Sequence, residues 1–135
     1  MNVTIRPYLA SDLNSVNQIL QSSFSCTKGS FASEEFQEIV ADIDGIVVGY
    51  LLLTRVLNPI KNHYYYLVDY VCVDSNYRGR GIGKYLLDYA YQVAKAGGGM
   101  YLQLTCSRFR IAAHKLYAKC NFMKRDSDIY RKEII

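Results

Sequence analysis

The sequence predicts one domain of the α/β or α+β class, in which helices cover the faces of a mixed β-sheet. At 135 residues the chain has room for little more than a single domain. Strand-like and helix-like segments follow each other in the order β-α-α-β-β-β-α-β-α-β-β. No repeat, low-complexity tract or linker interrupts this order, so residues 1–135 are expected to fold as one unit.

The N-terminal segments are predicted from a proline, a helix cap and a helical period. Alternating apolar residues before Pro7 predict a short first strand that the proline closes. Ser11 is a suitable N-cap for a helix whose apolar residues recur at helical spacing over Leu13–Leu20. A second, short helix is expected over Ser33–Glu38.

A hairpin is predicted next, because Asp44-Gly45 supplies the positive backbone angles of a tight turn. It joins Glu38–Ile43 to Ile46–Leu57. The remaining segments alternate strand and helix, and Gly97-Gly98-Gly99 ends the first of these helices. They are a strand over Tyr64–Val73, a helix over Gly83–Ala96, a strand over Met100–Cys106, a helix over Phe109–Lys119, and final strands over Phe122–Arg125 and Asp128–Ile134.

Composition excludes several classes of protein. The longest apolar run, Ile46–Leu53, is too short to span a bilayer, which needs about 20 residues. The N-terminal residues have no apolar signal core, so no export signal is expected. Four scattered cysteines without a CxxC pair argue against a disulfide framework or a metal site. Reduced thiols in a cytoplasmic protein fit this pattern.

Charge is distributed unevenly along the chain. Residues 1–73 hold four basic and seven acidic side chains, whereas residues 74–135 hold twelve basic and five acidic ones. The first half therefore suits a cationic ligand and the second an anionic one, although chance placement on a solvated surface explains the same numbers. The acidic side chains most relevant to a cationic ligand are Glu34, Glu35, Glu38, Asp42 and Asp44.

The strongest chemical signal lies between a predicted strand and a predicted helix, within Val71–Lys84. Its core is Arg78-Gly79-Arg80-Gly81-Ile82-Gly83-Lys84. Glycines allow successive backbone N–H groups to face one anion, and the helix N-terminus adds unpaired donors and a positive dipole. Two arginines and a lysine add cationic charge at the same place. This combination predicts a pyrophosphate site.

Spacing separates this loop from other phosphate-binding loops. A P-loop needs GxxxxGK followed by Ser or Thr, but only three residues separate Gly79 from Gly83 and Tyr85 replaces the hydroxyl. A dinucleotide fingerprint needs GxGxxG, whereas this loop has GxGxG. An RGG-type RNA-binding tract would be repetitive. A surface turn without a ligand remains the alternative.

Four segments of the chain resemble the GNAT superfamily of N-acetyltransferases. Residues 78–83 match its (Q/R)xxGx(G/A) motif, and VCVDSNYRGRGIGKYLLDYA as a whole resembles its acetyl-CoA core. IRPYLASDL resembles its opening strand and helix, DGIVVGYLLL its second hairpin, and AAHKLYAKCNF its A-x-x-(L/F)-Y-x-x-x-G-F segment. The resemblance implies a mixed, mostly antiparallel central sheet flanked by about four helices.

The resemblance also implies roles for matched positions. The strand before the loop would splay from its neighbour, so that its backbone at Val71 and Val73 pairs with the pantetheine arm of acetyl-CoA. Backbone amides of Arg78, Gly79, Arg80, Gly81, Ile82, Gly83 and Lys84 would wrap the pyrophosphate. A strand amide would polarise the thioester carbonyl, and the amine would attack it directly.

Two catalytic residues are expected. Tyr117 matches the tyrosine that protonates the departing thiolate in this family, although an aromatic on an amphipathic helix also fits a purely structural role. Asp69, two residues before Val71 and on the same face by strand alternation, is the candidate base that accepts the ammonium proton. Its alternative is a solvent-facing charge on an edge strand.

Other nucleophiles and bases are weaker candidates. His63 is expected at a loop end, and His114 is expected to pack or cap rather than to act chemically. Cys72 is expected to be a core thiol rather than the carrier of an acetyl group.

Two residues depart from the family pattern. Arg110 stands where Asn is common and is expected to contact a CoA phosphate or an anionic substrate group. Asn121 replaces the usual Gly of the G-F pair, which is tolerable because Asn accepts the left-handed conformation better than most residues.

The sequence predicts an N-acetyltransferase that modifies a primary amine, with a small cationic molecule favoured because of the acidic first half and the short loop over Phe24–Phe31. Acetylation of a protein amine and a non-catalytic acyl-CoA-binding module are the alternatives. No nucleic-acid or membrane partner is expected, and an exposed edge strand near the C-terminus would permit a homodimer.

Overall fold

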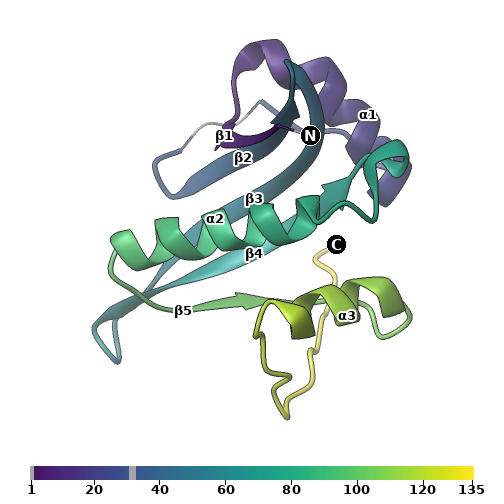
Figure 1. The fold of residues 1–135 in the computed structure, drawn as a ribbon. Helices are drawn as coiled ribbons and strands as arrows, with labels where there is room; N and C mark the ends of the chain where they lie inside the picture. Colours follow the sequence, from purple (N-terminus) through teal and green to yellow (C-terminus); the bar gives the residue numbers. More distant parts are fainter. Residues whose placement is uncertain (1, 31–32) are drawn as a thin grey trace.

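The computed structural model describes residues 2–30 and 33–135, and its centre is a five-stranded sheet (Figure 1). The strands follow one another across the sheet in chain order. They are β1 (Val3–Pro7), β2 (Phe36–Ile43), β3 (Ile46–Asn58), β4 (His63–Val73) and β5 (Gly99–Leu104). Neighbours are antiparallel except for β4 and β5, which are parallel. The expected mixed, mostly antiparallel sheet is therefore confirmed.

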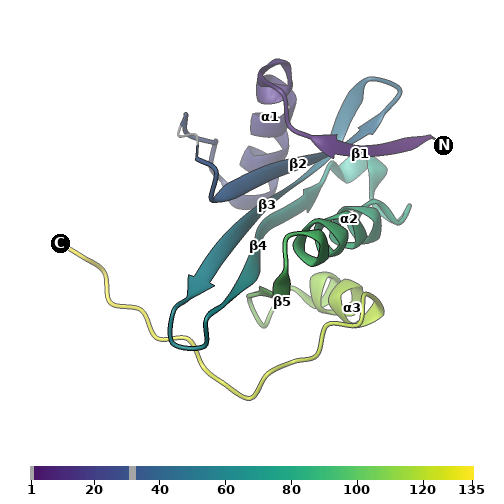
Figure 2. The ribbon, with the colours of Figure 1, turned by 90° about the vertical axis from the view of Figure 1, so that its left-hand side faces the viewer.

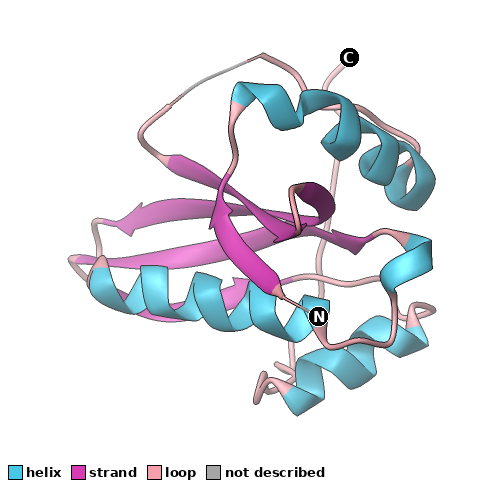
Figure 3. Cartoon of the chain, turned by 45° about the horizontal axis from the view of Figure 1, so that its top comes forward, coloured by secondary structure: helices cyan, strands magenta, loops and turns pink. Residues whose placement is uncertain are grey.

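Helices cover both faces of this sheet (Figures 2 and 3). On one face, α1 (Leu13–Phe24) packs its buried Val16, Ile19 and Leu20 against β2, β3 and Cys72 of β4. On the other face lie α2 (Ile82–Ala96) and α3 (Ile111–Lys119). The larger core on this second face joins apolar side chains of α2 and the strands to Tyr117 of α3.

The hairpin of β2 and β3 forms where Asp44-Gly45 predicts it. Both residues have positive φ, 51° and 87°, and Ile43 pairs with Ile46 across the turn. The Asp42 carboxylate accepts a hydrogen bond of 2.6 Å from the Gly45 amide, which fixes the turn from the preceding strand.

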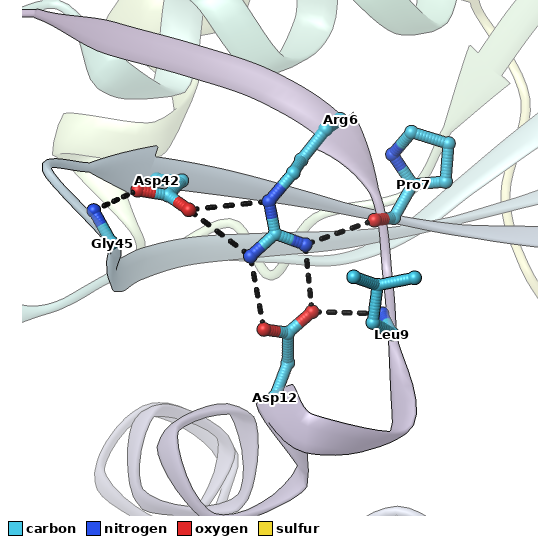
Figure 4. Close-up of polar contacts among 6 residues, drawn as sticks. All are labelled: Arg6, Pro7, Leu9, Asp12, Asp42 and Gly45. Atoms are coloured by element: carbon cyan, nitrogen blue, oxygen red, sulfur yellow. Dashed lines mark hydrogen bonds and ion pairs between the residues drawn. The ribbon is translucent and has the colours of Figure 1, made fainter.

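A guanidinium clamp ties β1 to the start of α1 (Figure 4). Arg6 donates to both oxygens of the buried Asp12 carboxylate, at 2.8 and 3.0 Å, and to Asp42 on β2. Asp12 also accepts from the Leu9 amide at 2.7 Å. The hydrogen bonds from Arg6 hold the pKa of Asp12 below its ordinary value, and those to Asp12 raise the pKa of Arg6. Asp12 closes a 3₁₀ turn, η1 (Ala10–Asp12), and takes the N-cap position of α1 expected for Ser11, but its carboxylate binds Arg6 and the Leu9 amide and does not cap the helix.

The short helix expected over Ser33–Glu38 is wrong. The Ser33 hydroxyl accepts a hydrogen bond from the Glu35 amide, and the Glu35 carbonyl accepts one from the Arg55 amide. β2 then begins at Phe36, opposite Thr54 of β3. Local side-chain bonding and sheet pairing therefore replace the helix. The expected loop over Phe24–Phe31 lies partly outside the described residues.

The two strands expected at the C-terminus are also wrong. After Cys120 the chain contains neither helix nor strand, and it extends from α3 as a tail (Figure 2). Met123, Tyr130 and Ile134 of this tail are almost fully exposed. They pair with no strand, although β5 is the last strand of the sheet, so the local alternation alone does not produce strands.

Within the described residues, no helix is both long and apolar enough to cross a membrane.

Candidate active site

A cleft opens where β4 and β5 separate. The parallel pairing of the two strands ends at Val68 and Leu104, whereas β4 continues to Val73 in contact with β3 alone. The cleft has a volume of about 340 Å³. It is lined by Phe24, Val68, Asp69, Tyr70, Val71, Leu104, Thr105, Cys106, Ser107, Arg110 and Tyr117. The structure thus brings Asp69, Val71 and Tyr117 to one site.

A β-bulge in β4 borders the cleft. Leu52 pairs with Asp69 but Tyr50 pairs with Cys72, so Tyr70 and Val71 together oppose Leu51. Tyr70 has a φ of 56°, a left-handed conformation that is costly for a bulky residue. Its ring lies edge-on to Phe24 at 5.2 Å between centroids.

This bulge overturns the expectation that Asp69 and Val71 share a face. Val68, Val71 and Val73 all pack in the core on the α2 face, which requires one extra residue between Val68 and Val71. Asp69 pairs with Leu52, whose side chain packs with Cys72 in the core on the α1 face. Asp69 therefore lies on the α1 face, opposite Val71, and both reach the cleft because it opens at the strand edge.

The Asp69 carboxylate is half-buried and forms no hydrogen bond or ion pair within residues 2–30 and 33–135. Burial raises its pKa above the ordinary value of an aspartate. A carboxylate that is desolvated and unpaired attracts a cation and holds a proton more tightly than one in water. These are the properties of a base that meets an ammonium group.

Tyr117 is held in place by the end of its helix. The Asn121 amide donates to the Ala118 carbonyl at 3.1 Å, and the Phe122 amide donates to the Tyr117 carbonyl at 3.0 Å. Asn121 has a φ of 66°, as expected for the residue that replaces glycine here. This is the Schellman arrangement, and its usual apolar contact is the edge-on packing of Phe122 against Tyr117 at 5.9 Å.

The environment of Tyr117 keeps its phenol protonated. Its side chain is buried, and burial raises its pKa above the ordinary value, with the Arg110 guanidinium acting in the opposite direction. A phenol with a raised pKa stays a proton donor at neutral pH.

The glycine-rich loop leaves β4 and enters α2. A 3₁₀ turn, η2 (Ser75–Tyr77), comes first and is capped by Asp74, which accepts from the Asn76 amide. Gly79 and Gly81 then have φ of 78° and 80°, so both need glycine. Gly81 is the N-cap of α2 and offers no side-chain cap. The first-turn amides of Ile82, Gly83 and Lys84 consequently have no backbone acceptor in the described part of the chain.

The cations of the loop have protein partners of their own. Arg78 donates to the Val73 carbonyl at 3.2 Å, and Arg80 donates to the Asn76 carbonyl at 3.5 Å and lies over the Tyr77 ring. Lys84 is ion-paired with Asp88 at 2.6 Å on the exposed surface of α2. The backbone donors of the loop are therefore the groups best suited to an anion, and the side chains supply surrounding positive charge.

Close packing joins the loop to the helix that carries Tyr117. A Cβ atom on Gly83 would lie 2.8 Å from Cδ2 of Leu116, one residue before Tyr117. Only glycine lets α3 approach the first turn of α2 this closely without a shift of the leucine.

Sequence reasoning missed part of the cleft wall. Phe24, Tyr70, Cys106 and Ser107 line it, but nothing in their local pattern marks them. Their position depends on the bulge and on the divergence of two strands. Arg110, which stood out as a departure from the family pattern, lies at the N-cap of α3 with its guanidinium 5.0 Å from the centre of the Phe24 ring.

The surroundings of the other candidate nucleophile and bases indicate structural roles. Cys72 is buried, and burial raises its pKa to about 12, so it is a neutral core thiol. His114 lies 2.8 Å from the Ser107 carbonyl, as expected for a packing or capping residue. His63 begins β4 and lies against the Tyr101 ring, outside the cleft lining.

The acidic residues of the first half do not gather at the cleft. Glu38 is ion-paired with Lys28 at 3.3 Å and accepts from the Tyr50 hydroxyl, while Asp42 is held by Arg6. Glu34 and Glu35 line a separate hollow with Arg55. Asp69 is the acidic residue that borders the cleft.

Comparisons with known proteins agree with this geometry. The sequence matches the Acetyltransferase (GNAT) family over residues 11–122. No curated protein sequence matches it significantly. Among solved structures, a transcriptional regulator from Bacillus halodurans has a TM-score of 0.87 at 22% identity, with 98% of this chain and 100% of that chain covered.

Two further similar structures are acetyltransferases. A ribosomal-protein-alanine N-acetyltransferase from Brucella melitensis has a TM-score of 0.83 at 22% identity, covering 98% of this chain and 99% of that one. An aminoglycoside acetyltransferase from an uncultured soil metagenomic sample, in complex with sisomicin, has a TM-score of 0.84 at 15% identity, covering 98% and 96%. At these identities the likeness concerns the fold.

Proposed function

The chain belongs to the GNAT acetyltransferase family, and from this premise we propose that it transfers an acetyl group from acetyl-CoA to a primary amine. The observation that carries the proposal is the cleft where β4 and β5 separate, which has Tyr117 in its wall, together with the glycine-rich loop that follows the same strand. The family as a whole uses acetyl-CoA as co-substrate.

The residues present fit the donor. Val71 and Val73 lie on the stretch of β4 that no longer pairs with β5, so one backbone edge is open to an extended ligand. The amides of Ile82, Gly83 and Lys84 at the start of α2, together with the two left-handed glycines before them, suit a pyrophosphate. Acetyl-CoA supplies the activated acetyl group and the thiolate that departs.

The chemistry assigned to the protein consists of positioning and proton transfer. Asp69 binds the incoming ammonium and accepts one of its protons, so that the amine lone pair can form the new C–N bond. As the C–S bond breaks, the Tyr117 hydroxyl gives its proton to the sulfur, and the second proton that the nitrogen loses as the amide forms restores that hydroxyl. The open backbone of β4 near the bulge at Tyr70 offers an amide to the carbonyl oxygen.

A small acceptor is favoured over a protein amine, because the Phe24 ring and Arg110 reach across the cleft and leave about 340 Å³. The charge of the N-terminal half no longer supports a polycationic acceptor, since Glu38 and Asp42 are neutralised by internal partners. A cytoplasmic location and the formation of a homodimer remain predictions, as does the single-domain boundary at residues 1–135.

The proposal is tested with calorimetry and a free-thiol assay. The protein is titrated with acetyl-CoA, and CoA release is then measured over a panel of primary amines. We expect acetyl-CoA binding, amine-dependent CoA release, and a fall in kcat without loss of acetyl-CoA binding in Tyr117→Phe. Absence of acetyl-CoA binding would refute the proposal. Binding without turnover on any amine, unaffected by Tyr117→Phe, would favour the non-catalytic binding module.

A further inference from the structure

Two opposite charges line the cleft without a charged partner. The Asp69 carboxylate has none among residues 2–30 and 33–135. Over the same residues, the Arg110 guanidinium has neither a carboxylate nor a hydrogen-bond acceptor, and its contact is the face of the Phe24 ring. Other charged side chains at structurally important places do have partners, as Arg6 with Asp12 and Lys28 with Glu38 show.

Helix stability does not explain Arg110. It occupies the N-cap position of α3, forms no side-chain cap, and places a cation at the positive end of the helix dipole. No acidic residue in the first turn compensates for it. Ser, Thr, Asp or Asn at this position would stabilise the helix more. An arginine here is better explained by an anion that the protein itself does not provide.

Arg110 is directed toward the α1 face of β4, where Asp69 also lies. Its guanidinium contacts Phe24, the last residue of α1. It is also close enough to Cys72, which packs on that face, to oppose the rise in the pKa of the Cys72 thiol. The glycine-rich loop, with its own cations Arg78, Arg80 and Lys84, follows the far end of β4. Arg110 lines the cleft together with Asp69, whereas the loop cations Arg78, Arg80 and Lys84 are not among the residues of its wall.

We infer that the acceptor is an amino acid or a close analogue, a primary amine that carries a carboxylate, with its ammonium at Asp69 and its carboxylate at Arg110. This inference rests on the proposed acetyl transfer and specifies its acceptor. Guanidinium binds a carboxylate through two parallel hydrogen bonds, and one monoanion neutralises one arginine, whereas a phosphate dianion would leave excess charge in a half-buried cleft. The Phe24 ring lies 5.0 Å from the guanidinium carbon and supports it beside the cleft.

The test compares matched acceptors that differ in one charge. Glycine, β-alanine and 4-aminobutyrate are assayed against glycinamide, β-alaninamide and 4-aminobutyramide, with kcat/KM expressed per deprotonated amine. We expect at least one carboxylate to exceed its amide by about tenfold to a hundredfold, the size expected for a hydrogen-bonded charge pair. In Arg110→Gln this preference should fall to near unity, with KM for acetyl-CoA unchanged.

Arg108→Gln is the matched control, because it removes the same charge two residues away, from a side chain that is exposed and paired with Asp128. It should keep the preference. If the amides are acetylated as well as the carboxylates, or if Arg110→Gln raises KM for acetyl-CoA and leaves the preference intact, the inference is wrong. Both results still include acetyl-CoA-dependent turnover, so they leave the proposed function standing. Failure of acetyl-CoA to bind would instead remove the proposed function itself.

Discussion

Replacing Asn121 by valine and by glycine tests how the end of α3 holds Tyr117. Asn121 has a φ of 66°, a conformation that costs a side chain roughly 1–2 kcal/mol, costs asparagine less, and costs glycine nothing. Unwinding the cap would lose two hydrogen bonds, worth about 1 kcal/mol each, and the contact between Phe122 and Tyr117, worth about 0.5–1.5 kcal/mol.

These magnitudes decide the outcome. The strain of valine, roughly 1–2 kcal/mol, is smaller than the roughly 2.5–3.5 kcal/mol that unwinding would lose, so Asn121→Val should keep the cap and lower stability. For a domain of this size that loss lowers Tm by about 3–10 °C. Asn121→Gly should change Tm by no more than a few degrees. When Phe122→Ala is added to the valine variant, the energy lost on unwinding falls to about 2 kcal/mol, which is close to the strain of valine. The cap should then unwind in part of the molecules, and kcat should fall severalfold because Tyr117 is no longer held.

The assays are thermal unfolding followed by circular dichroism, and steady-state kinetics with the best acceptor of the amine panel. Acetyl-CoA affinity serves as the internal control, since the loop that suits the pyrophosphate connects β4 to α2 and is not part of α3. Equal Tm values for the valine variant and the unmodified protein would contradict the claim that the positive φ at position 121 strains valine. So would a glycine variant that loses as much stability as the valine variant.

Three further predictions concern the loop, the base and the clamp. Gly81→Ala should weaken acetyl-CoA binding in calorimetry by about tenfold, because a φ of 80° strains alanine by roughly 1–2 kcal/mol. Gly98→Ala is the control, since Gly98 has a φ of 76° at the far end of α2; it should lower stability by a similar amount and leave acetyl-CoA binding unchanged. The value of kcat/KM should fall toward acid pH with an apparent pKa above the value of about 3.9 of an ordinary aspartate, because burial raises the pKa of Asp69 and the base must be deprotonated. Asp69→Asn should abolish this fall at acid pH. If the fall persisted in the variant, another residue would be the base. Asp12→Asn should lower the free energy of unfolding by about 2–4 kcal/mol at pH 7, measured by urea titration. Because Arg6 lowers the pKa of Asp12 in the folded state, that difference should be fully present above about pH 4 and shrink as pH falls through the folded pKa.

Local signals in the sequence predict the elements whose structure depends on neighbouring residues. The turn at Asp44-Gly45 needs positive φ at two adjacent positions, and few other dipeptides supply it. The left-handed Asn121 follows the same logic. The helix over α2 ends where three glycines stop the apolar period. In each case the backbone requirement and the residue lie at the same place in the chain.

The failures arise where the outcome depends on distant residues. The tail has the alternation of a strand, but alternation does not decide whether a segment pairs, and residues near Tyr130 stay exposed although β5 is the last strand of the sheet. Ser33 begins a plausible helix, yet Phe36 pairs with Thr54 on another strand. The face of Asp69 depends on one extra residue in β4 relative to β3, and no composition rule locates such a residue.

The bulge at Tyr70 also explains how one strand can serve two substrates. A regular β4 would place Asp69 and Val71 on the same face and direct both toward α2 or both toward α1. With the bulge, the Val71 and Val73 side chains pack in the core beneath α2 while the Asp69 carboxylate faces the side of α1 and Arg110. In the proposed reaction the donor then lies along the open edge of the strand, and the acceptor approaches from the α1 face. Tyr70, which has the strained φ, contacts the Phe24 ring, and the same ring contacts the Arg110 guanidinium. Tyr70, whose bulge separates the sites of the two substrates, and Arg110, which we expect to select the acceptor, are thus connected through Phe24.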